Sequence, residues 1–269
     1  MTYRDIEDSI EDGKPTSLYE IRLGTLEWFY TTAEYEVTHN ANLYLPLPVR
    51  HTDVSQTSDI TKSNVTVTLP RDIPLCDHLK PLPPSGVVTV TVFEKHIDDA
   101  EHRLVWKGRV INSEWEGRRC KLTVESIMTS LNRRTNKLKD SAQCSKTLYS
   151  CGVDKLIFEA SVTADSVVGL TISSTGFSIY TDGWFNGGYV EWDNLTTGAT
   201  ESRMISSSTT TDITVTSVPF GLVATTVIRV YPGCNRRITT CKNKFNNGDN
   251  CGSTPYIPTK NPFGGTIIF

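Results

Sequence analysis

The sequence predicts a mainly β protein: an N-terminal antiparallel β domain, then a smaller β-rich domain pinned by a cluster of four cysteines. Threonine, serine and valine are abundant, and many short segments alternate apolar and polar residues with the two-residue period of a strand. Only short stretches have a helical period. We expect the first domain over residues 1–139, the second over residues 140–252, and an extended tail over residues 253–269.

The N-terminal region contains most of the clear strand patterns. A short amphipathic helix is expected first, over residues 3–12, because Ile6 and Ile10 are four residues apart and Asp12-Gly13 follows. The expected strands are residues 18–23, 28–31, 35–37, 43–45, 65–70, 87–93, 103–111 and 120–125. The first two make a plausible hairpin. Together these spacings predict an antiparallel meander, folded as a sandwich or a partly open barrel.

A second β region follows a boundary segment over residues 126–138, which is expected to hold a helical turn. The expected strands are residues 170–172, 177–180, 187–192, 202–205, 213–215 and 227–231. A strand pair is expected around Trp184 and Trp192, with the turn at Asp182-Gly183. From residue 245 to residue 258 turn-forming residues dominate, so this segment is expected to lack regular structure.

Composition and charge argue against several classes of protein. The chain has 27 basic and 30 acidic residues and a formal net charge of −3, without the basic stripe of a nucleic-acid-binding protein. No run of eighteen apolar residues occurs, so no membrane span is expected. The acidic N-terminus lacks the apolar core of a signal peptide, so we expect folding in a reducing cytoplasm where thiols stay free.

Two cysteine pairs with the same internal spacing are the main functional signal. Cys144 and Cys151 have six residues between them, as do Cys234 and Cys241, and 82 residues separate the two pairs. Two such pairs brought together by the fold supply four thiolates to one point, which is the usual donor set of a structural zinc or an iron–sulfur cluster. The spacing leaves both groups open.

Packing is the alternative explanation for cysteines, because a free cysteine is a small apolar residue that is often buried. The chain has seven cysteines, an odd number that counts against a purely disulfide framework. Cys120 lies on the apolar face of an expected strand and Cys76 in a proline-rich connection. A packing role is expected for both.

Several short motifs occur together along the chain. They are Glu7-x-Ser9-Ile10, Gly13-x-Pro15-x-x-Leu18-Tyr19-Glu20, Trp106-x-Gly108-x-Val110, Cys144-x-x-x-Leu148-Tyr149-x-x-Cys151-Gly152-Val153-Asp154, Gly187-Gly188-x-Val190-x-Trp192, Pro232-Gly233-Cys234-x-Arg236 and Cys241-x-x-x-Phe245-x-Asn247. With these motifs the chain resembles the phage-encoded BR0599 family over nearly its whole length. Its C-terminal cysteine layout is also similar to that of the tail tip protein L of lambda-like siphophages.

The resemblance implies a structural component of the tail tip, or baseplate hub, of a long-tailed phage, assembled in the host cytoplasm. It implies a homotrimeric ring that contacts a distal tail protein and a central hub or fibre protein. It further implies a [4Fe-4S] cluster in the C-terminal domain, with Cys144, Cys151, Cys234 and Cys241 as ligands. One position departs from the family, which usually has an aromatic residue where this chain has Cys251. A ligand exchange between Cys251 and Cys241 therefore stays open.

Other functions were weighed against a structural role. A zinc-stapled tail protein and a redox-active iron–sulfur protein use the same cysteines. Catalysis is not expected, because the five histidines, His39, His51, His78, His96 and His102, belong to no recognisable nucleophile or metalloprotease motif. A carbohydrate-binding sandwich would use Trp184, Tyr189 and Trp192 for stacking, although buried aromatic residues are the commoner explanation of such a pattern.

Overall fold

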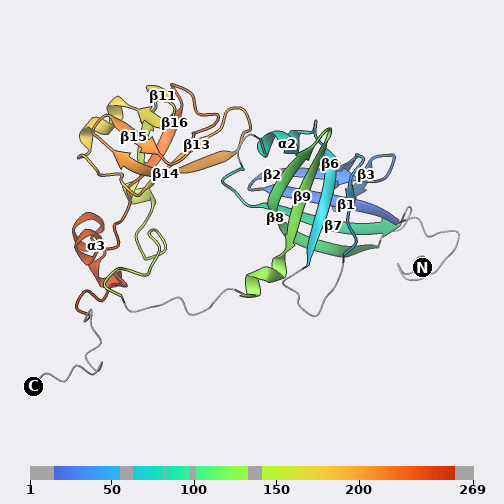
Figure 1. Ribbon diagram of the computed structural model, residues 1–269, viewed down its shortest axis with the longest axis horizontal. Helices are drawn as coiled ribbons and strands as arrows, with labels where there is room; N and C mark the ends of the chain where they lie inside the picture. The colour runs from blue at the N-terminus through green and yellow to red at the C-terminus, as the bar shows by residue number, and fades with distance from the viewer. Residues whose placement is uncertain (1–14, 55–62, 81–82, 97–100, 133–140, 258–269) are drawn as a thin grey trace, which may run out of the picture. The chain divides into compact units, whose positions relative to one another are not determined.

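The computed structural model describes residues 15–54, 63–80, 83–96, 101–132 and 141–257 (Figure 1). The chain divides between Arg133 and Arg134 into two compact units, here called the N-terminal unit and the C-terminal unit. Each unit has its own β-sheet and its own hydrophobic core, so the predicted mainly β fold is confirmed. The helix expected over residues 3–12 and the domain boundary expected after residue 139 lie outside the described residues. No helix in the described ranges is both long and apolar enough to cross a membrane.

The N-terminal unit is built on a nine-stranded sheet with the order β3-β4-β2-β1-β7-β8-β9-β6-β5. Its elements are β1 (Pro15–Leu23), β2 (Leu26–Thr31), β3 (Val37–His39), β4 (Asn42–Pro46), β5 (Arg50–His51), β6 (Asn64–Pro70), α2 (Pro74–His78), β7 (Val88–His96), β8 (His102–Glu116), β9 (Arg119–Ser126) and the 3₁₀ helix η1 (Ile127–Asn132). The sheet curls, so that β6 and β9 cross β1 and β2 (Figure 1), while β8 pairs with β7 on one side and β9 on the other.

The strand order departs from the predicted meander. The hairpin of β1 and β2 is present, but β1 also pairs along its whole length with β7, some seventy residues later in the chain. Strand β6 pairs with β9 rather than with β7, and β2 and β4 form a short parallel contact. Alternation of apolar and polar residues along the sequence identifies a strand and its turn. Which distant strands pair depends instead on the shape of the whole core. The predicted meander was therefore wrong here.

The core of the N-terminal unit follows the two-residue period of its strands. Val65, Val67 and Leu69 of β6 are all at most 1% exposed, as expected for one face of a half-buried strand. Cys76 and Cys120 are fully buried in the same core and lie beside each other, so the packing role predicted for both is confirmed. Cys76 lies on the short helix α2 rather than in an irregular connection.

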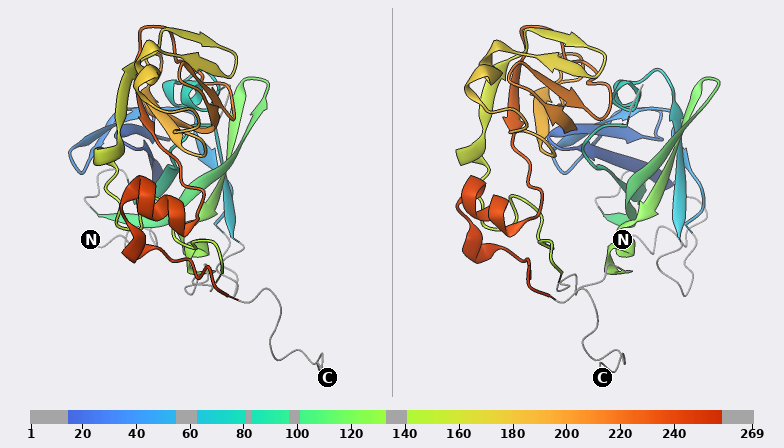
Figure 2. Two further views of the ribbon diagram at one scale, coloured as in Figure 1. Left: turned by 90° about the vertical axis from the view of Figure 1, so that its left-hand side faces the viewer. Right: turned by 60° about the vertical axis from the view of Figure 1, so that its left-hand side comes forward.

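The C-terminal unit contains a seven-stranded sheet with the order β10-β16-β13-β14-β15-β12-β11. Its elements are the 3₁₀ helix η2 (Leu156–Phe158), β10 (Ala160–Thr163), β11 (Ser166–Val168), β12 (Thr171–Ser173), the 3₁₀ helix η3 (Thr175–Ile179), β13 (Tyr189–Asp193), β14 (Thr200–Ser208), β15 (Asp212–Val215), β16 (Val227–Tyr231), α3 (Ile238–Phe245) and the 3₁₀ helix η4 (Gly248–Asn250). Helix α3 and the loop after residue 141 lie side by side at one end of this sheet (Figures 1 and 2).

Three predictions for the C-terminal unit were wrong. Residues 177–180 are not a strand, because Ser174 caps η3 by accepting a hydrogen bond from the Gly176 N–H. Trp184 lies in a turn, and only Trp192 of the expected strand pair lies in a strand. Helix α3 was not foreseen, nor was η4 in the segment expected to lack regular structure. Helix α3 is anchored by the buried Phe245, whose ring packs edge-on against Phe158.

Candidate metal centre

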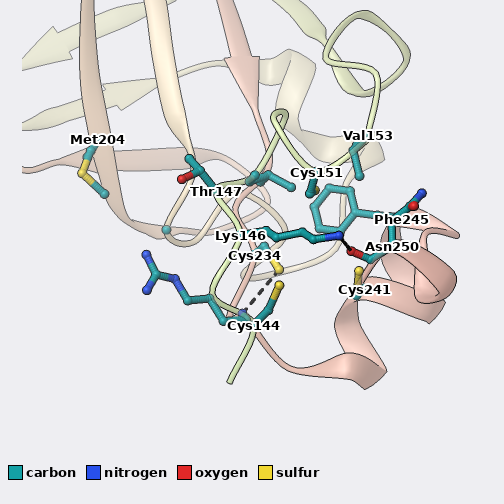
Figure 3. A pocket seen from close by; sticks show the side chains of 13 residues that line it. Cys144, Lys146, Thr147, Cys151, Val153, Met204, Cys234, Cys241, Phe245 and Asn250 are labelled. Atoms are coloured by element: carbon teal, nitrogen blue, oxygen red, sulfur yellow. Dashed lines mark hydrogen bonds between the residues drawn. The ribbon is translucent and has the colours of Figure 1, made fainter. Parts of the chain in front are cut away.

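The four cysteines predicted as ligands line one cavity of about 210 Å³ in the C-terminal unit (Figure 3). Cys144 and Cys151 come from the loop before η2, Cys234 follows β16, and Cys241 lies on α3. The other residues that line the cavity include no histidine, aspartate or glutamate; they are Lys146, Thr147, Leu148, Val153, Gly187, Met204, Arg236, Phe245 and Asn250. Thiols are thus the strong metal donors of this cavity.

Two hydrogen bonds join the first cysteine pair to the second. The backbone N–H of Cys144 donates to the carbonyl of Arg236 at 2.8 Å. The hydroxyl of Tyr149, which stands between Cys144 and Cys151 in the chain, donates to the carbonyl of Pro232 at 2.8 Å. Arg236 and Tyr149 both have positive φ angles, of 62° and 67°, which turn the backbone sharply beside each pair. These two hydrogen bonds connect the loops that carry the two cysteine pairs.

The lack of a side chain at Gly233 allows the chain to pass from β16 to the second cysteine pair. This glycine follows β16 and packs backbone to backbone against the Gly187-Gly188 turn. A Cβ atom at residue 233 would lie 2.2 Å from the Asn186 carbonyl oxygen, a distance that real Cβ atoms essentially never show. Because these neighbours are backbone atoms, no side-chain rotation relieves the clash. Only glycine delivers Cys234 to this position.

Three of the four sulfurs accept N–H hydrogen bonds. The Gly252 N–H donates to Cys144 Sγ at 3.2 Å, and the Arg236 N–H donates to Cys234 Sγ at 3.3 Å. Asn247 Nδ2 lies 3.7 Å from Cys151 Sγ, to which it donates. Such donors favour the thiolate form of cysteine, and hydrogen bonds to the sulfurs are one of the factors that set the potential of an iron–sulfur cluster.

Cys241 differs from the other three. Its thiol donates a hydrogen bond to the Asn247 carbonyl oxygen at 3.1 Å. Burial raises the pKa of this thiol to about 12, with Cys251 adding to the rise. Metal binding at Cys241 requires loss of the thiol proton.

A fifth thiol lies at the same place. The side chain of Cys251 interacts with those of Cys241 and Cys144, and its sulfur lies 3.2 Å from the Ser253 hydroxyl oxygen. The departure of Cys251 from the family pattern was the only signal for it in the sequence, because its spacing matches neither pair. The chain segment that carries it lies against the first cysteine loop.

Lys244 places a positive charge close to Cys234. Its Nζ donates to the carbonyl of Gly233 at 3.0 Å and to that of Trp184, and it stands 4.6 Å from the centre of the Trp184 ring. Burial lowers the pKa of Lys244 to about 8, although the nearby Cys234 opposes this fall. No pattern in the sequence indicated this contact, because Lys244 and Lys242 look alike on the same helix.

The donor set fits a group larger than one ion. In the ranges that the structure describes, no three histidine, cysteine, aspartate or glutamate side chains lie close enough together to hold one metal ion. The four thiols instead line the wall of a cavity of about 210 Å³. Thiolates spaced around a volume of this kind suit a multi-iron cluster, whose ligands bind different metal atoms.

A family comparison gives an independent account of this region. The model of the family described as "Phage conserved hypothetical protein BR0599" matches residues 183–261. The resemblance to the BR0599 family is confirmed over these residues. The matched residues include both members of the second cysteine pair, Cys251, and the Gly187-Gly188 turn that packs against Gly233.

Two relatives extend the comparison. An "Uncharacterized protein" of Xylella fastidiosa (strain 9a5c) is 25% identical over 165 residues, which cover 57% of this chain and 34% of the relative. The chain thus matches about a third of the length of that protein. A chain in the solved structure of the "Virion of native gene transfer agent (GTA) particle" has the same fold, with a TM-score of 0.83 at 15% sequence identity. That match covers 96% of this chain and 93% of the other.

Proposed function

We propose that this chain is a structural protein of a phage-type virion, located in the tail tip, whose C-terminal unit is stapled by a [4Fe-4S] cluster. The ligands are Cys144, Cys151, Cys234 and Cys241. One observation carries the proposal: segments 82 residues apart bring four free thiols to the wall of one cavity. A cluster bound there joins the entrance and the exit of the C-terminal sheet, and its binding energy becomes folding energy.

The fold comparison supports the place of the protein in a virion. The chain matches a chain of a virion particle over 96% of its length, so this part of the proposal is an analogy of fold. Within the virion we place the chain in a homotrimeric ring at the tail tip, between a distal tail protein and a central hub or fibre protein. Closed rings of identical subunits are the usual form of such assemblies.

The lining of the cavity supports a structural rather than a catalytic centre. A nucleophilic cysteine needs a base, and among the residues that the structure describes no histidine or carboxylate lines the cavity beside its thiols. Lys146, which lines the cavity, donates from Nζ to the Asn250 carbonyl, and the Nζ of the nearby Lys244 donates to two backbone carbonyls. The cysteines are thus arranged to hold a group in place.

The three aromatic residues that a carbohydrate-binding role would use are occupied by other contacts. Trp192 is fully buried in the core of the C-terminal unit, and Tyr189 stacks on Tyr231 at a ring-centroid distance of 4.9 Å. The face of Trp184 is approached by Lys244. None of the three offers the free aromatic face that a sugar ring requires.

Anaerobic purification of the full chain, with quantification of iron, acid-labile sulfide and zinc, tests the cluster. We expect four iron and four sulfide per chain and a broad absorption band at roughly 400 nm. One zinc per chain in a colourless protein identifies the zinc-stapled alternative instead. Absence of both metals from the wild-type chain, with the fold intact, refutes the staple.

The place in the virion has a separate test. Particles from cells that express an epitope-tagged chain are examined by immunogold electron microscopy, and the mass of the purified chain is measured by native mass spectrometry. We expect label at the end of the tail and a trimeric mass, alone or with the neighbouring tail proteins. Label on the capsid, or a chain absent from purified particles, contradicts the proposal.

A further inference from the structure

Hydrogen bonds on both sides of Cys251 fix its position. Lys146 Nζ donates to the Asn250 carbonyl at 2.7 Å, and the Cys251 N–H donates to the Gly248 carbonyl at 3.1 Å. On the other side, the Gly252 N–H donates to Cys144 Sγ at 3.2 Å and the Thr254 N–H to the Ser141 carbonyl at 2.8 Å. These bonds tie the residues around Cys251 to the first cysteine loop, so its half-buried thiol is held at the group of sulfurs.

The fourth ligand position is less firmly defined than the other three. Cys144, Cys151 and Cys234 already accept N–H hydrogen bonds, which favour their thiolate forms. Cys241 Sγ instead lies 3.1 Å from the Asn247 carbonyl oxygen, and a bond from this sulfur to a metal has to replace that contact. Cys251 has no such bond to a carbonyl oxygen; within the described residues its sulfur contacts the Ser253 hydroxyl and the neighbouring thiols.

The two candidates for the fourth position lie next to each other. Cys251 interacts directly with Cys241, and it also contacts Cys144, whose role as a ligand is common to either arrangement. Cys241 itself lines the cavity, and Cys251 lies directly beside it. A bond from iron to one of them leaves the other as a protonated thiol beside the cluster.

We propose that Cys241 and Cys251 are interchangeable fourth ligands, so that either one completes the site formed by Cys144, Cys151 and Cys234. This inference rests on the proposed iron–sulfur staple. The chain then has a reserve thiol: oxidation or substitution of one of the two cysteines leaves a complete set of four. The sequence spacing alone favours Cys241 as the fourth ligand. The hydrogen bonds of the folded chain make Cys251 an equally good candidate for that position.

Single and double substitutions in the full chain test the inference. The variants are Cys241→Ala, Cys251→Ala, the double variant, and Cys234→Ala as the matched loss of a ligand without a neighbouring replacement. Each is reconstituted anaerobically with ferrous iron and sulfide, and iron, sulfide and the absorption near roughly 400 nm are measured. We expect both single variants to retain the wild-type iron content, and the double variant and Cys234→Ala to lose it.

Two results overturn the inference. Loss of iron from Cys241→Ala to the level of Cys234→Ala shows that Cys251 does not substitute, and loss of iron from Cys251→Ala shows that Cys251 is required. A wild-type chain that binds no iron instead refutes the proposed staple, so the two failures are distinguishable. If Cys241→Ala is insoluble, Cys241→Ser is compared with the double variant Cys241→Ser/Cys251→Ala, because serine keeps a donor for the Asn247 carbonyl but its oxygen can itself bind iron; circular dichroism of each variant confirms its fold.

Discussion

The hydroxyl of Tyr149 donates a hydrogen bond to the carbonyl of Pro232, at 2.8 Å and across 83 residues of sequence. This bond ties the loop of the first cysteine pair to the turn that leads into the second. The ring of Tyr149 also packs edge-on against Tyr189 and Tyr231 of the sheet. The cysteine loops are thus attached to the sheet by one residue that is not itself a candidate ligand.

Removal of this hydroxyl should weaken the C-terminal unit modestly. Tyr149→Phe keeps the ring contacts and leaves the Pro232 carbonyl without its donor, so we expect a loss of about 0.5–1.5 kcal/mol in the free energy of unfolding. Urea denaturation at neutral pH measures it. Tyr180→Phe is the matched control, because no hydrogen bond of the Tyr180 hydroxyl occurs in the part of the chain that the structure describes. Equal effects of the two substitutions would count against a role for the Tyr149 bond.

Gly233→Ala should prevent correct folding of the C-terminal unit. The added methyl would meet backbone atoms at 2.2 Å, and a cost above about 4 kcal/mol is expected for an overlap that no side chain can relieve. Gly169→Ala is the control, because Gly169 has a φ of +61° but nothing within 4 Å of the added atom. Gly169→Ala should lower the free energy of unfolding by about 1 kcal/mol, from backbone strain alone. Thermal unfolding by circular dichroism compares them, and a Gly233→Ala protein with wild-type stability would refute the close approach.

Lys244 should make the stability of the C-terminal unit depend on alkaline pH. Burial lowers its pKa from 10.5 to about 8, so between these values the unfolded chain holds more protons than the folded one. Stability should therefore rise as the pH rises through this window, and the cost of the buried charge is fully present below it. Lys244→Met should remove the rise.

Urea denaturation of the metal-free chain at several pH values from about pH 8 to about pH 10 measures this dependence. Lys242→Met is the matched control, since Lys242 is an exposed lysine on the same helix. The assignment fails if Lys244→Met and the wild-type chain gain the same stability over the window.

Removal of metal should affect one unit only. All four proposed ligands belong to the C-terminal unit, and each unit has its own core. Calorimetry of the loaded chain should show two transitions, of which a chelator lowers only that of the C-terminal unit, because its binding energy is lost. In Cys234→Ala that transition should be low already and insensitive to chelator. A chelator that leaves both transitions unchanged would exclude a stabilising metal.

Local patterns in the sequence located most strands of both sheets. Alternation predicted β6 and β9 correctly because one face of each is buried in a core and the other is not. The same logic failed at residues 177–180, where Phe177 is fully buried inside a 3₁₀ turn capped by Ser174. There a single capping hydrogen bond outweighs the strand preference of the apolar residues.

The candidate site was partly foreseeable. Equal spacing indicated the two cysteine pairs, and the structure brings all four to one cavity. Their role as ligands stays a prediction. The sequence did not indicate the contacts that depend on distant backbone, such as that of Asn247 with Cys151 across 96 residues. Helix α3 was missed as well, because eight residues with two lysines in the last turn have little helical period of their own.

The cavity has a consequence for how the protein is made. Its walls run from Cys144 to Asn250, so the ribosome releases the first cysteine loop long before the opposite wall exists. A nascent chain that stops short of residue 234 exposes Cys144 and Cys151 with nothing to enclose them. Formation of the cavity therefore requires that translation has passed residue 250, and a nascent chain that stops earlier is chemically distinguishable from one that has passed this point.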